Sequence, residues 1–173
     1  MQSTQSSNSM QISSALIGRD FMDRDSLLYI AGFVDGEGCI SLYRTTSSHH
    51  CKKYTYYYEG LVITNTNREV IQWIRDSVGY GCVYEHKKAI GNRKIKYEYK
   101  ISQDRAVDLI KQLLPFLIVK KQQALKILEY RELRGEAKHG YRNIMPSETR
   151  EKLLSMVPEL RKLNARGKID LAA

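Results

Sequence analysis

The stretch Leu27-Leu28-Tyr29-Ile30-Ala31-Gly32-Phe33-Val34-Asp35-Gly36-Glu37-Gly38 decides how the rest of the sequence is interpreted. Its first eight residues carry no charge and are nearly all apolar, and two carboxylates that alternate with glycine follow them. We interpret it as a short buried helix, from residue 26 to Asp35, that Gly36 and Gly38 bring to an end. Because a helix C-terminus carries partial negative charge, acids there are destabilising unless a cation lies beside them. The pattern therefore predicts that the acids have a use.

The composition limits the class of protein. The 173 residues are long enough for one domain with a proper core, and the net charge of +9 is unusually high. This excess favours a polyanionic partner, most often nucleic acid and sometimes an anionic membrane surface, although it can also serve solubility alone. No stretch approaches the ~20 apolar residues that cross a bilayer, so we expect no membrane partner.

The N-terminus and the cysteines bear on the compartment. The Ser- and Gln-rich start of the chain lacks the pattern of a secretory signal or of an Arg-rich transit peptide, and it is predicted as a disordered or loosely ordered tail. Three cysteines, Cys39, Cys51 and Cys82, show no framework spacing. We expect an intracellular, reducing compartment, and the sequence does not distinguish an organelle from a prokaryotic cytoplasm.

The remaining elements follow from hydrophobic period and turn residues. We expect strands over residues 40–46 and 54–64, a helix that Gly79 and Gly81 close, a hairpin over residues 82–102 around Gly91-Asn92, a helix that Pro115 ends, and helices over residues 119–133 and 147–163. This order predicts an α+β fold with an antiparallel sheet. The expected division is a tail over residues 1–22, a core over 23–134, and a basic linker with a C-terminal helix over 135–173.

One face of the predicted sheet is polar, basic and aromatic, whereas the other face is apolar and packs on helices. A two-stranded ribbon fits the DNA major groove, where polar side chains can read base edges. An ordinary solvated face and a surface that stacks RNA bases are the alternatives, although the 12 tyrosines of the chain favour nucleic acid. The candidate DNA-binding residues on these strands are Ser41, Tyr43, Thr45, Tyr56, Tyr58, Val62, Tyr84, His86, Lys96, Glu98 and Lys100.

The acids and two lysines are the candidate chemical groups. One carboxylate with a Gly36 carbonyl makes a poor cage for Ca²⁺ but suits Mg²⁺, which keeps several waters and binds phosphate oxygens. Such a metal can activate water for phosphodiester hydrolysis, whereas a solvated helix end is the plainer alternative. Lys120 and Lys121 begin a helix, where a basic group could stabilise charge on a phosphate or form a surface pair. His49-His50-Cys51 lacks partners at zinc spacing and is predicted as a loop tip.

At these residues the chain resembles a known family. The core Ile30-Ala31-Gly32-Phe33-Val34-Asp35-Gly36-Glu37-Gly38 is similar to the signature helix of LAGLIDADG homing endonucleases, with Glu at the second acidic position. Leu61-Val62-Ile63-Thr64-Asn65-Thr66 and Leu113-Leu114-Pro115-Phe116-Leu117 with Lys120 also resemble the family pattern, as does the helix–strand–strand–helix–strand–strand–helix order. The resemblance covers residues 26–133. It implies an antiparallel, saddle-shaped DNA-binding sheet with helices on its other face.

The resemblance also implies residue roles. Glu37 would be the essential metal-binding carboxylate, with the Gly36 carbonyl as a second ligand. Lys120 would match the active-site lysine near the scissile phosphate, and Asn65 a polar residue that positions water. Asp35 would shape the end of the helix pair. Arg68 would match a basic DNA-binding residue after the second strand.

The signature helix occurs once, so a second chain is the natural partner. Its small residues allow close approach of another backbone, which predicts a twofold interface through Leu28, Ala31, Gly32 and Asp35. Single-motif members of the family are similarly homodimers, which implies a pseudo-palindromic site of roughly 20 base pairs. We expect an intron-encoded, site-specific double-strand DNA endonuclease, a hydrolase that uses Mg²⁺ or another divalent cation. The alternatives are a maturase that binds intron RNA and a DNA-binding regulator that does not cleave.

Overall fold

The computed structural model describes residues 22–49, 52–86, 94–136 and 146–165. The elements are α1 (Arg24–Glu37), β1 (Gly38–His49), β2 (Lys52–Asn65), α2 (Arg68–Val78), β3 (Cys82–His86), β4 (Lys96–Ser102), α3 (Gln103–Leu113), α4 (Lys121–Glu136) and α5 (Ser147–Asn164). The expected turn at Gly91-Asn92, the tail before residue 22 and most of the basic linker lie outside the described residues. Of the expected loop tip His49-His50-Cys51, His49 is the last residue of β1 and the other two residues lie outside the described part. No helix in the described part of the chain is long and apolar enough to cross a membrane.

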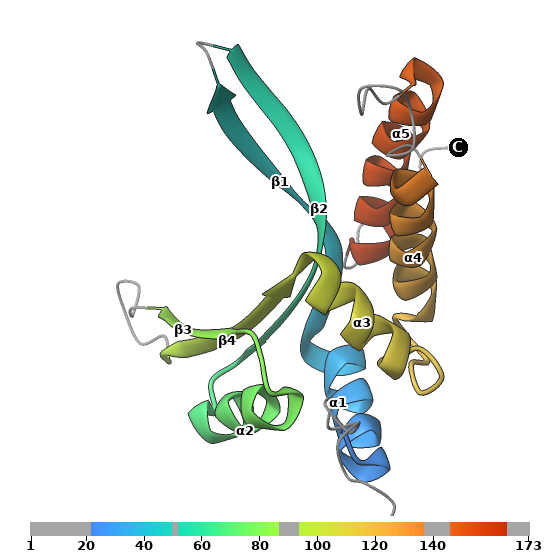
Figure 1. Cartoon of the computed structure of the whole chain (residues 1–173). Coiled ribbons are helices and arrows are strands. Elements are labelled where there is room, and N and C mark those ends of the chain that lie inside the picture. The colour runs from blue at the N-terminus through green and yellow to red at the C-terminus, as the bar shows by residue number, and fades with distance from the viewer. Residues whose placement is uncertain (1–21, 50–51, 87–93, 137–145, 166–173) are drawn as a thin grey trace, which may run out of the picture.

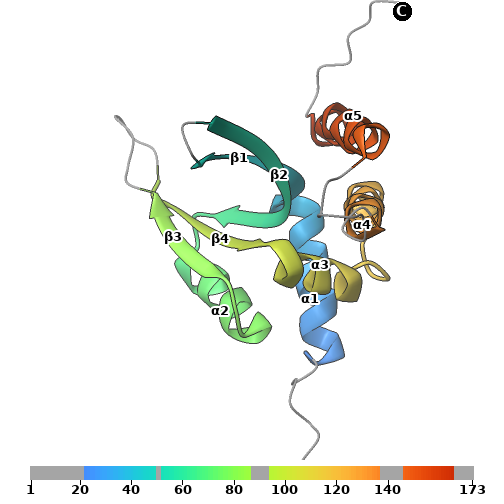
Figure 2. The ribbon, with the colours of Figure 1, turned by 45° about the horizontal axis from the view of Figure 1, so that its top comes forward.

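A four-stranded antiparallel sheet forms the centre of the fold, with the strand order β1-β2-β4-β3. The hairpin of β1 and β2 is the longest part of the sheet, and β3 and β4 extend from it in a different direction (Figure 1). The helices lie along one side of the curved sheet in both views, which leaves the other side open (Figure 2). The predicted α+β class and the antiparallel sheet with helices on one face are therefore confirmed.

The core lies between the helices and the alternate residues of the strands that point toward them. Ile40 in β1, Leu61 and Ile63 in β2, and Tyr99 in β4 are fully buried, as period-two alternation requires of one face. From the other side α1 buries Ile30, Ala31 and Val34, and α3 buries Leu109, Ile110 and Leu113. Burial of each large aliphatic side chain contributes about 1.5–3 kcal/mol, so this layer fixes α1 against the sheet.

Helix α1 extends two residues further at each end than the sequence predicted. Asp23 caps its start by accepting a 2.9 Å hydrogen bond from the Ser26 amide. Gly36 lies inside the helix, and Gly38 follows it in an extended conformation with φ −81°. A Cβ at Gly38 would lie 2.7 Å from the Val34 carbonyl oxygen, so glycine permits the tight passage from α1 into β1. Glu37 is thus the last residue of the helix. The sequence had predicted that the helix ends at Asp35 and that Glu37 follows it.

Helix α5 packs against α4 and β1. Leu153, Met156, Val157 and Leu160 are buried in the same hydrophobic cluster as α1 and the sheet. Asn164 donates a 2.9 Å hydrogen bond to the Ile40 carbonyl and so joins the end of α5 to β1. The expected division of the chain at residue 134 stays a prediction. The buried residues of α5 belong to the same hydrophobic cluster as the helices and strands before residue 134.

Candidate functional site

The end of α1 and the start of α4 are bound to one another through Asp35 and Lys120. The Asp35 carboxylate accepts hydrogen bonds from the amides of Ile118, Val119 and Lys120 at 2.7, 3.1 and 2.9 Å. In return the Lys120 ammonium donates to the backbone carbonyl of Asp35 at 2.5 Å. No acid lies in the first turn of α4 and no base in the last turn of α1, so each helix end receives its complementary charge from the other.

This arrangement explains the ionisation of Asp35. Partial burial raises the pKa of the Asp35 carboxyl, but the three backbone amides and the charge of Lys120 outweigh that effect and hold its pKa below the ordinary value of an aspartate. Asp35 is therefore ionised at neutral pH, and its two oxygens are directed at backbone amides.

Glu37 has a different environment at the same helix end. Both Gly36 and Glu37 are exposed, and a Cβ at Gly36 would meet nothing within 4 Å. Among the described residues, none forms a hydrogen bond or an ion pair with the Glu37 carboxylate. The described part of the chain also holds no cluster of three or more His, Cys, Asp or Glu side chains that could hold a metal. One free carboxylate fits a cation that takes most ligands from water and phosphate, as Mg²⁺ does.

The strand register brings most of the predicted DNA-binding residues to the open face of the sheet. Ser41 lies opposite Gly60, Tyr43 opposite Tyr58 and Thr45 opposite Tyr56, whereas Val62 lies opposite Lys100 on the next strand. Tyr84 and His86 lie opposite Glu98 and Lys96. Because these positions alternate with the buried ones, their side chains point away from the helices. This set, which we call the open-face residues, comprises Ser41, Tyr43, Thr45, Tyr56, Tyr58, Val62, Tyr84, His86, Lys96, Glu98 and Lys100.

Tyr43 lies flat on this face. A Cβ at Gly60 would be 2.7 Å from Cδ2 of the Tyr43 ring, so the ring covers the glycine directly. The ring stacks on Tyr58 with centroids 6.0 Å apart, and the Lys100 ammonium lies 5.5 Å from its centroid. Burial raises the pKa of the Tyr43 hydroxyl, and nearby Cys39 adds to the increase. The Lys100 ammonium therefore lies over the face of the Tyr43 ring.

His86 and Glu98 form a pair on the same face, with Nε2 and Oε2 3.0 Å apart.

Two other predicted residues lie elsewhere. Arg68 is the first residue of α2, and its guanidinium lies 5.9 Å from the ring centroid of Tyr97 on the helix-covered side of β4. Asn65 ends β2, where its side-chain oxygen accepts a 2.8 Å hydrogen bond from the Asn67 amide in the turn to α2.

The exposed side of α1 carries a strip of residues at four-residue spacing. Leu28 is 44 % exposed, and a Cβ at Gly32 or at Gly36 would meet nothing within 4 Å. Nothing in the described part of the chain therefore requires glycine at residue 32, where it costs about 1 kcal/mol relative to alanine. The structure does not bring Ala31 to this strip, because Ala31 is buried in the core of its own chain.

A model of the LAGLIDADG endonuclease family matches residues 30–145. The chain belongs to this family. The predicted recognition and the endonuclease class are thereby confirmed. Comparison with curated proteins gave no match.

Solved structures share the fold of this LAGLIDADG endonuclease. The homing endonuclease I-CvuI, solved with a DNA target and Mg, is 20 % identical, with a TM-score of 0.67 over 87 % of this chain and 88 % of that one. The archaeal intron-encoded homing endonuclease I-Vdi141I, complexed with DNA, is 22 % identical, with a TM-score of 0.62 over 84 % and 88 %. The LAGLIDADG meganuclease I-AabMI, bound to uncleaved DNA, is 20 % identical, with a TM-score of 0.55 over 75 % of this chain and only 42 % of that one.

The sequence interpretation missed a charged group inside this LAGLIDADG fold. Glu59 is fully buried on the helix side of β2, with Arg131 and Arg134 of α4 within 3.0 and 3.2 Å. Arg131 also lies 2.6 Å from Asp104 at the start of α3. Glu59 shares the odd-numbered face of Leu61 and Ile63, so a charged residue in an apolar series was the available signal.

Proposed function

We propose that this LAGLIDADG endonuclease cleaves both strands of a specific DNA duplex, as a homodimer that carries a divalent cation at Glu37. One observation carries the proposal, namely that the two carboxylates at the end of α1 have different surroundings. Asp35 is bound by three backbone amides, whereas Glu37 is exposed and unpaired among the described residues. An unpaired carboxylate at the negative end of a helix dipole is costly unless it binds a cation.

Glu37 and the Gly36 carbonyl would hold the cation, which when bound polarises a phosphodiester and activates water. Lys120 is only 8 % exposed and is bound to the carbonyl of Asp35, the residue before Gly36. Its fixed position supports a role in which it stabilises negative charge on a phosphate beside the cation. Asn65 has its amide oxygen engaged by a turn, so a water-positioning role would fall to its amide nitrogen.

The open-face residues would bind the DNA. They join two lysines, a histidine and several tyrosines on a surface that no helix covers (Figure 2). A curved antiparallel ribbon of this kind fits the major groove, where such side chains reach base edges. Arg68, on α2, would contact DNA only beyond the edge of the sheet.

Two observations support a homodimer. The strip of Leu28, Gly32 and Gly36 leaves room for another backbone, and one chain supplies one free carboxylate for two DNA strands. In addition, the fold of this chain accounts for 42 % of the longer I-AabMI chain, so two copies would match one such chain in size. A twofold dimer would require a pseudo-palindromic site.

The test compares Glu37→Gln with wild type on DNA selected for cleavage from a randomised library. We expect wild type to cut in Mg²⁺, and Glu37→Gln to lose cleavage while keeping its DNA affinity, since phosphate contacts supply most of that affinity. Glu132→Gln, at an exposed position of α4, is the matched control and should cut normally. Undiminished cutting by Glu37→Gln would refute the proposal. It would also be refuted if intron RNA displaced the DNA from the protein and wild type cut no duplex.

A further inference from the structure

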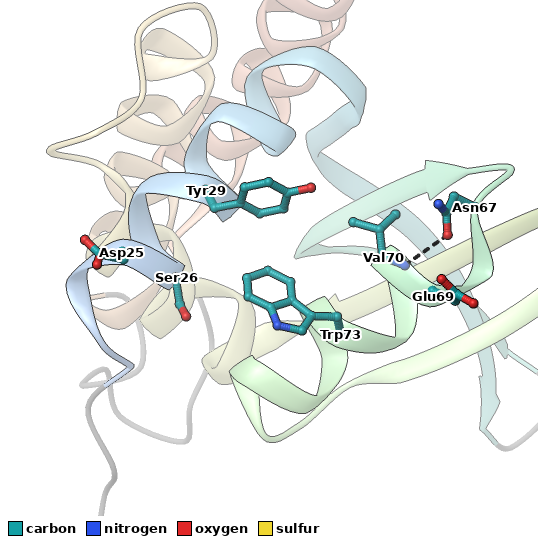
Figure 3. Close-up of a pocket in the computed structure, with 7 residues that line it drawn as sticks. All are labelled: Asp25, Ser26, Tyr29, Asn67, Glu69, Val70 and Trp73. Atoms are coloured by element: carbon teal, nitrogen blue, oxygen red, sulfur yellow. Dashed lines mark hydrogen bonds between the residues drawn. The ribbon is translucent and has the colours of Figure 1, made fainter.

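The open face of the sheet carries one acid among its lysines. Glu98 lies in β4 between Lys96 and Lys100, which share its face at two-residue spacing, and it is the single carboxylate among the open-face residues. Exposed acids such as Asp25 and Glu69 lie instead on the helix side, around a pocket of about 520 Å³ between α1 and α2 (Figure 3). A carboxylate that faces DNA is repelled by the phosphates, so an acid on the open face has a cost that a specific contact must offset.

The Glu98 carboxylate is held at one oxygen and is free at the other. Its Oε2 lies 3.0 Å from Nε2 of His86, which belongs to the neighbouring strand β3. Its Oε1 forms no hydrogen bond within the described part of the chain, yet it is open to solvent. No ion pair among the described residues joins Glu98 to Lys96 or Lys100, and the Lys100 ammonium lies over the ring of Tyr43. The side chain of Glu98, 23 % exposed, therefore presents one oriented acceptor to the open face.

The bases of a DNA duplex offer few partners to such an acceptor. In the major groove the hydrogen-bond donors are the amino groups N4 of cytosine and N6 of adenine, whereas the edges of guanine and thymine present acceptors. Adenine also presents the acceptor N7 beside its amino group, and a carboxylate is repelled by it. Cytosine presents its N4 donor without an acceptor, so its edge suits a carboxylate best.

We propose that Glu98 selects a cytosine in the bound DNA, by accepting a hydrogen bond from cytosine N4 at its free Oε1. Glu98 is thus a specificity residue, and His86 is a positioning residue that orients the carboxylate through Oε2. Lys96 and Lys100, on either side along β4, offset the repulsion between the carboxylate and the phosphates. The inference rests on the proposed function only in that the open face binds duplex DNA, and it requires neither cleavage nor a homodimer.

Selection of bound duplexes from a randomised DNA library tests the proposal with the full-length protein. Wild type should prefer cytosine over adenine at one base pair by about tenfold, which a specific base contact supplies. Glu98→Gln should change the preference at that base pair alone, from cytosine to adenine, because glutamine accepts from adenine N6 and donates to N7. Glu85→Gln removes the same charge from an exposed residue of β3 that alternates onto the other face, opposite Tyr97, and should leave the selected sequence unchanged.

The role of His86 has a separate readout. Because the imidazole orients the carboxylate, His86→Ala should weaken the preference for cytosine at the same base pair without creating a preference for adenine. A preference that changes only at a different base pair in His86→Ala would overturn the positioning role, since His86 would then contact a base of its own.

The possible results separate this inference from the proposed function. If wild type selects and cuts a site, and Glu98→Gln selects the same sequence, the inference alone is overturned. Binding of Glu98→Gln that tightens equally on every sequence would also overturn it, because the carboxylate would then only repel DNA. A wild type that selects a site with cytosine at the affected base pair, but cuts no DNA, would refute the proposed cleavage and support the role of Glu98. A wild type that selects no duplex would overturn both.

Discussion

Asp35 and Lys120, which are 85 residues apart, bind each other in both directions: the Asp35 carboxylate accepts from the Lys120 amide, and the Lys120 ammonium donates to the Asp35 carbonyl. Each of these charges would be unfavourable at its own helix end, an acid at the C-terminus of α1 and a base at the N-terminus of α4. The contact makes both interactions favourable, because the Asp35 carboxylate lies at the N-terminus of α4 and the Lys120 ammonium lies at the C-terminus of α1. The pair therefore fixes Lys120 close to Gly36 and Glu37.

The first prediction concerns Asp35→Asn. An asparagine offers one oxygen where the carboxylate offers two, and its NH₂ group would face a backbone amide, so we expect a loss of about 2 kcal/mol in the free energy of unfolding at pH 7. The pKa of Asp35 is lowered in the folded state, so its contribution is complete well above pH 3.8 and is lost as pH falls through the folded-state pKa. Urea unfolding between pH 7 and pH 3 should show the difference between wild type and variant shrinking below pH 3.8.

Asp76→Asn provides the control, because Asp76 is exposed and its nearest charged partner is its neighbour Arg75. It should cost less than about 1 kcal/mol. A difference between wild type and Asp35→Asn that stays constant with pH would show that the carboxylate charge does not stabilise the α1–α4 junction.

The second prediction concerns Gly32 and distinguishes an effect on the stability of one chain from an effect on formation of the proposed dimer. Because a Cβ there meets nothing within 4 Å, Gly32→Ala should raise helix stability by about 1 kcal/mol where the protein is monomeric. Gly32→Leu should fold but should sediment as a monomer, since its side chain would keep a partner helix away. Gly135 in α4 also has open space around it, so Gly135→Leu is the matched control. An unchanged sedimentation coefficient for Gly32→Leu would place the interface elsewhere.

The order of elements was predictable because their signals are local. Asn67 caps α2, and Gly79 ends it in a left-handed conformation with φ 79°, as turn chemistry requires. Alternation along β1, β2, β3 and β4 was sufficient to place the open-face residues together. The end of α1 was misplaced by two residues because Gly36 was interpreted as a stop, whereas the helix continues to Glu37.

Relationships that depend on tertiary packing could not be predicted in the same way. The partners of Asp35 come from residues 118–120, and no local pattern connects these two segments. Ala31 and Gly32 are adjacent small residues, yet only the packing of α1 shows that the first is buried and the second is open. Arg68 was assigned from the family pattern, and its position on α2 follows from where β2 ends.

The third prediction concerns the covered glycine of the sheet. Gly60→Ala should destabilise the fold by about 1–3 kcal/mol, because its Cβ would lie 2.7 Å from the Tyr43 ring. In a Tyr43→Ala background the same substitution should cost much less. A double-mutant cycle in guanidinium chloride measures the coupling. Equal costs in both backgrounds would contradict the flat position of the Tyr43 ring.

The fourth prediction uses the salt dependence of DNA binding. If Lys96 contacts a phosphate, Lys96→Gln should weaken binding to all sequences alike and reduce the slope of log K against log salt by about 0.9. Lys111→Gln, on an exposed position of α3 on the helix side, should leave the slope unchanged. A loss confined to particular base pairs would instead make Lys96 a base-reading residue.

The last prediction tests the buried Glu59. Its Oε1 lies 3.0 Å from the Arg131 Nε without a hydrogen bond, whereas its Oε2 accepts long hydrogen bonds from Arg131 Nη2 at 3.4 Å and from Arg134 Nη1 at 3.2 Å, so the attraction of opposite charges is a large part of this contact. Glu59→Leu would remove the buried acid from two half-buried guanidinium groups, of which Arg131 keeps only the exposed Asp104, and should cost about 3–5 kcal/mol in chemical unfolding. Replacing Arg131 by Met and Arg134 by Leu in the same chain should recover much of that loss, because a buried ion pair seldom exceeds a well-packed apolar substitute. Asp104→Asn, whose side chain is 84 % exposed, should change stability by less than about 1 kcal/mol. If Glu59→Leu unfolds at the same denaturant concentration as wild type, the arginines do not require Glu59, and α4 is held to β2 by its apolar contacts alone.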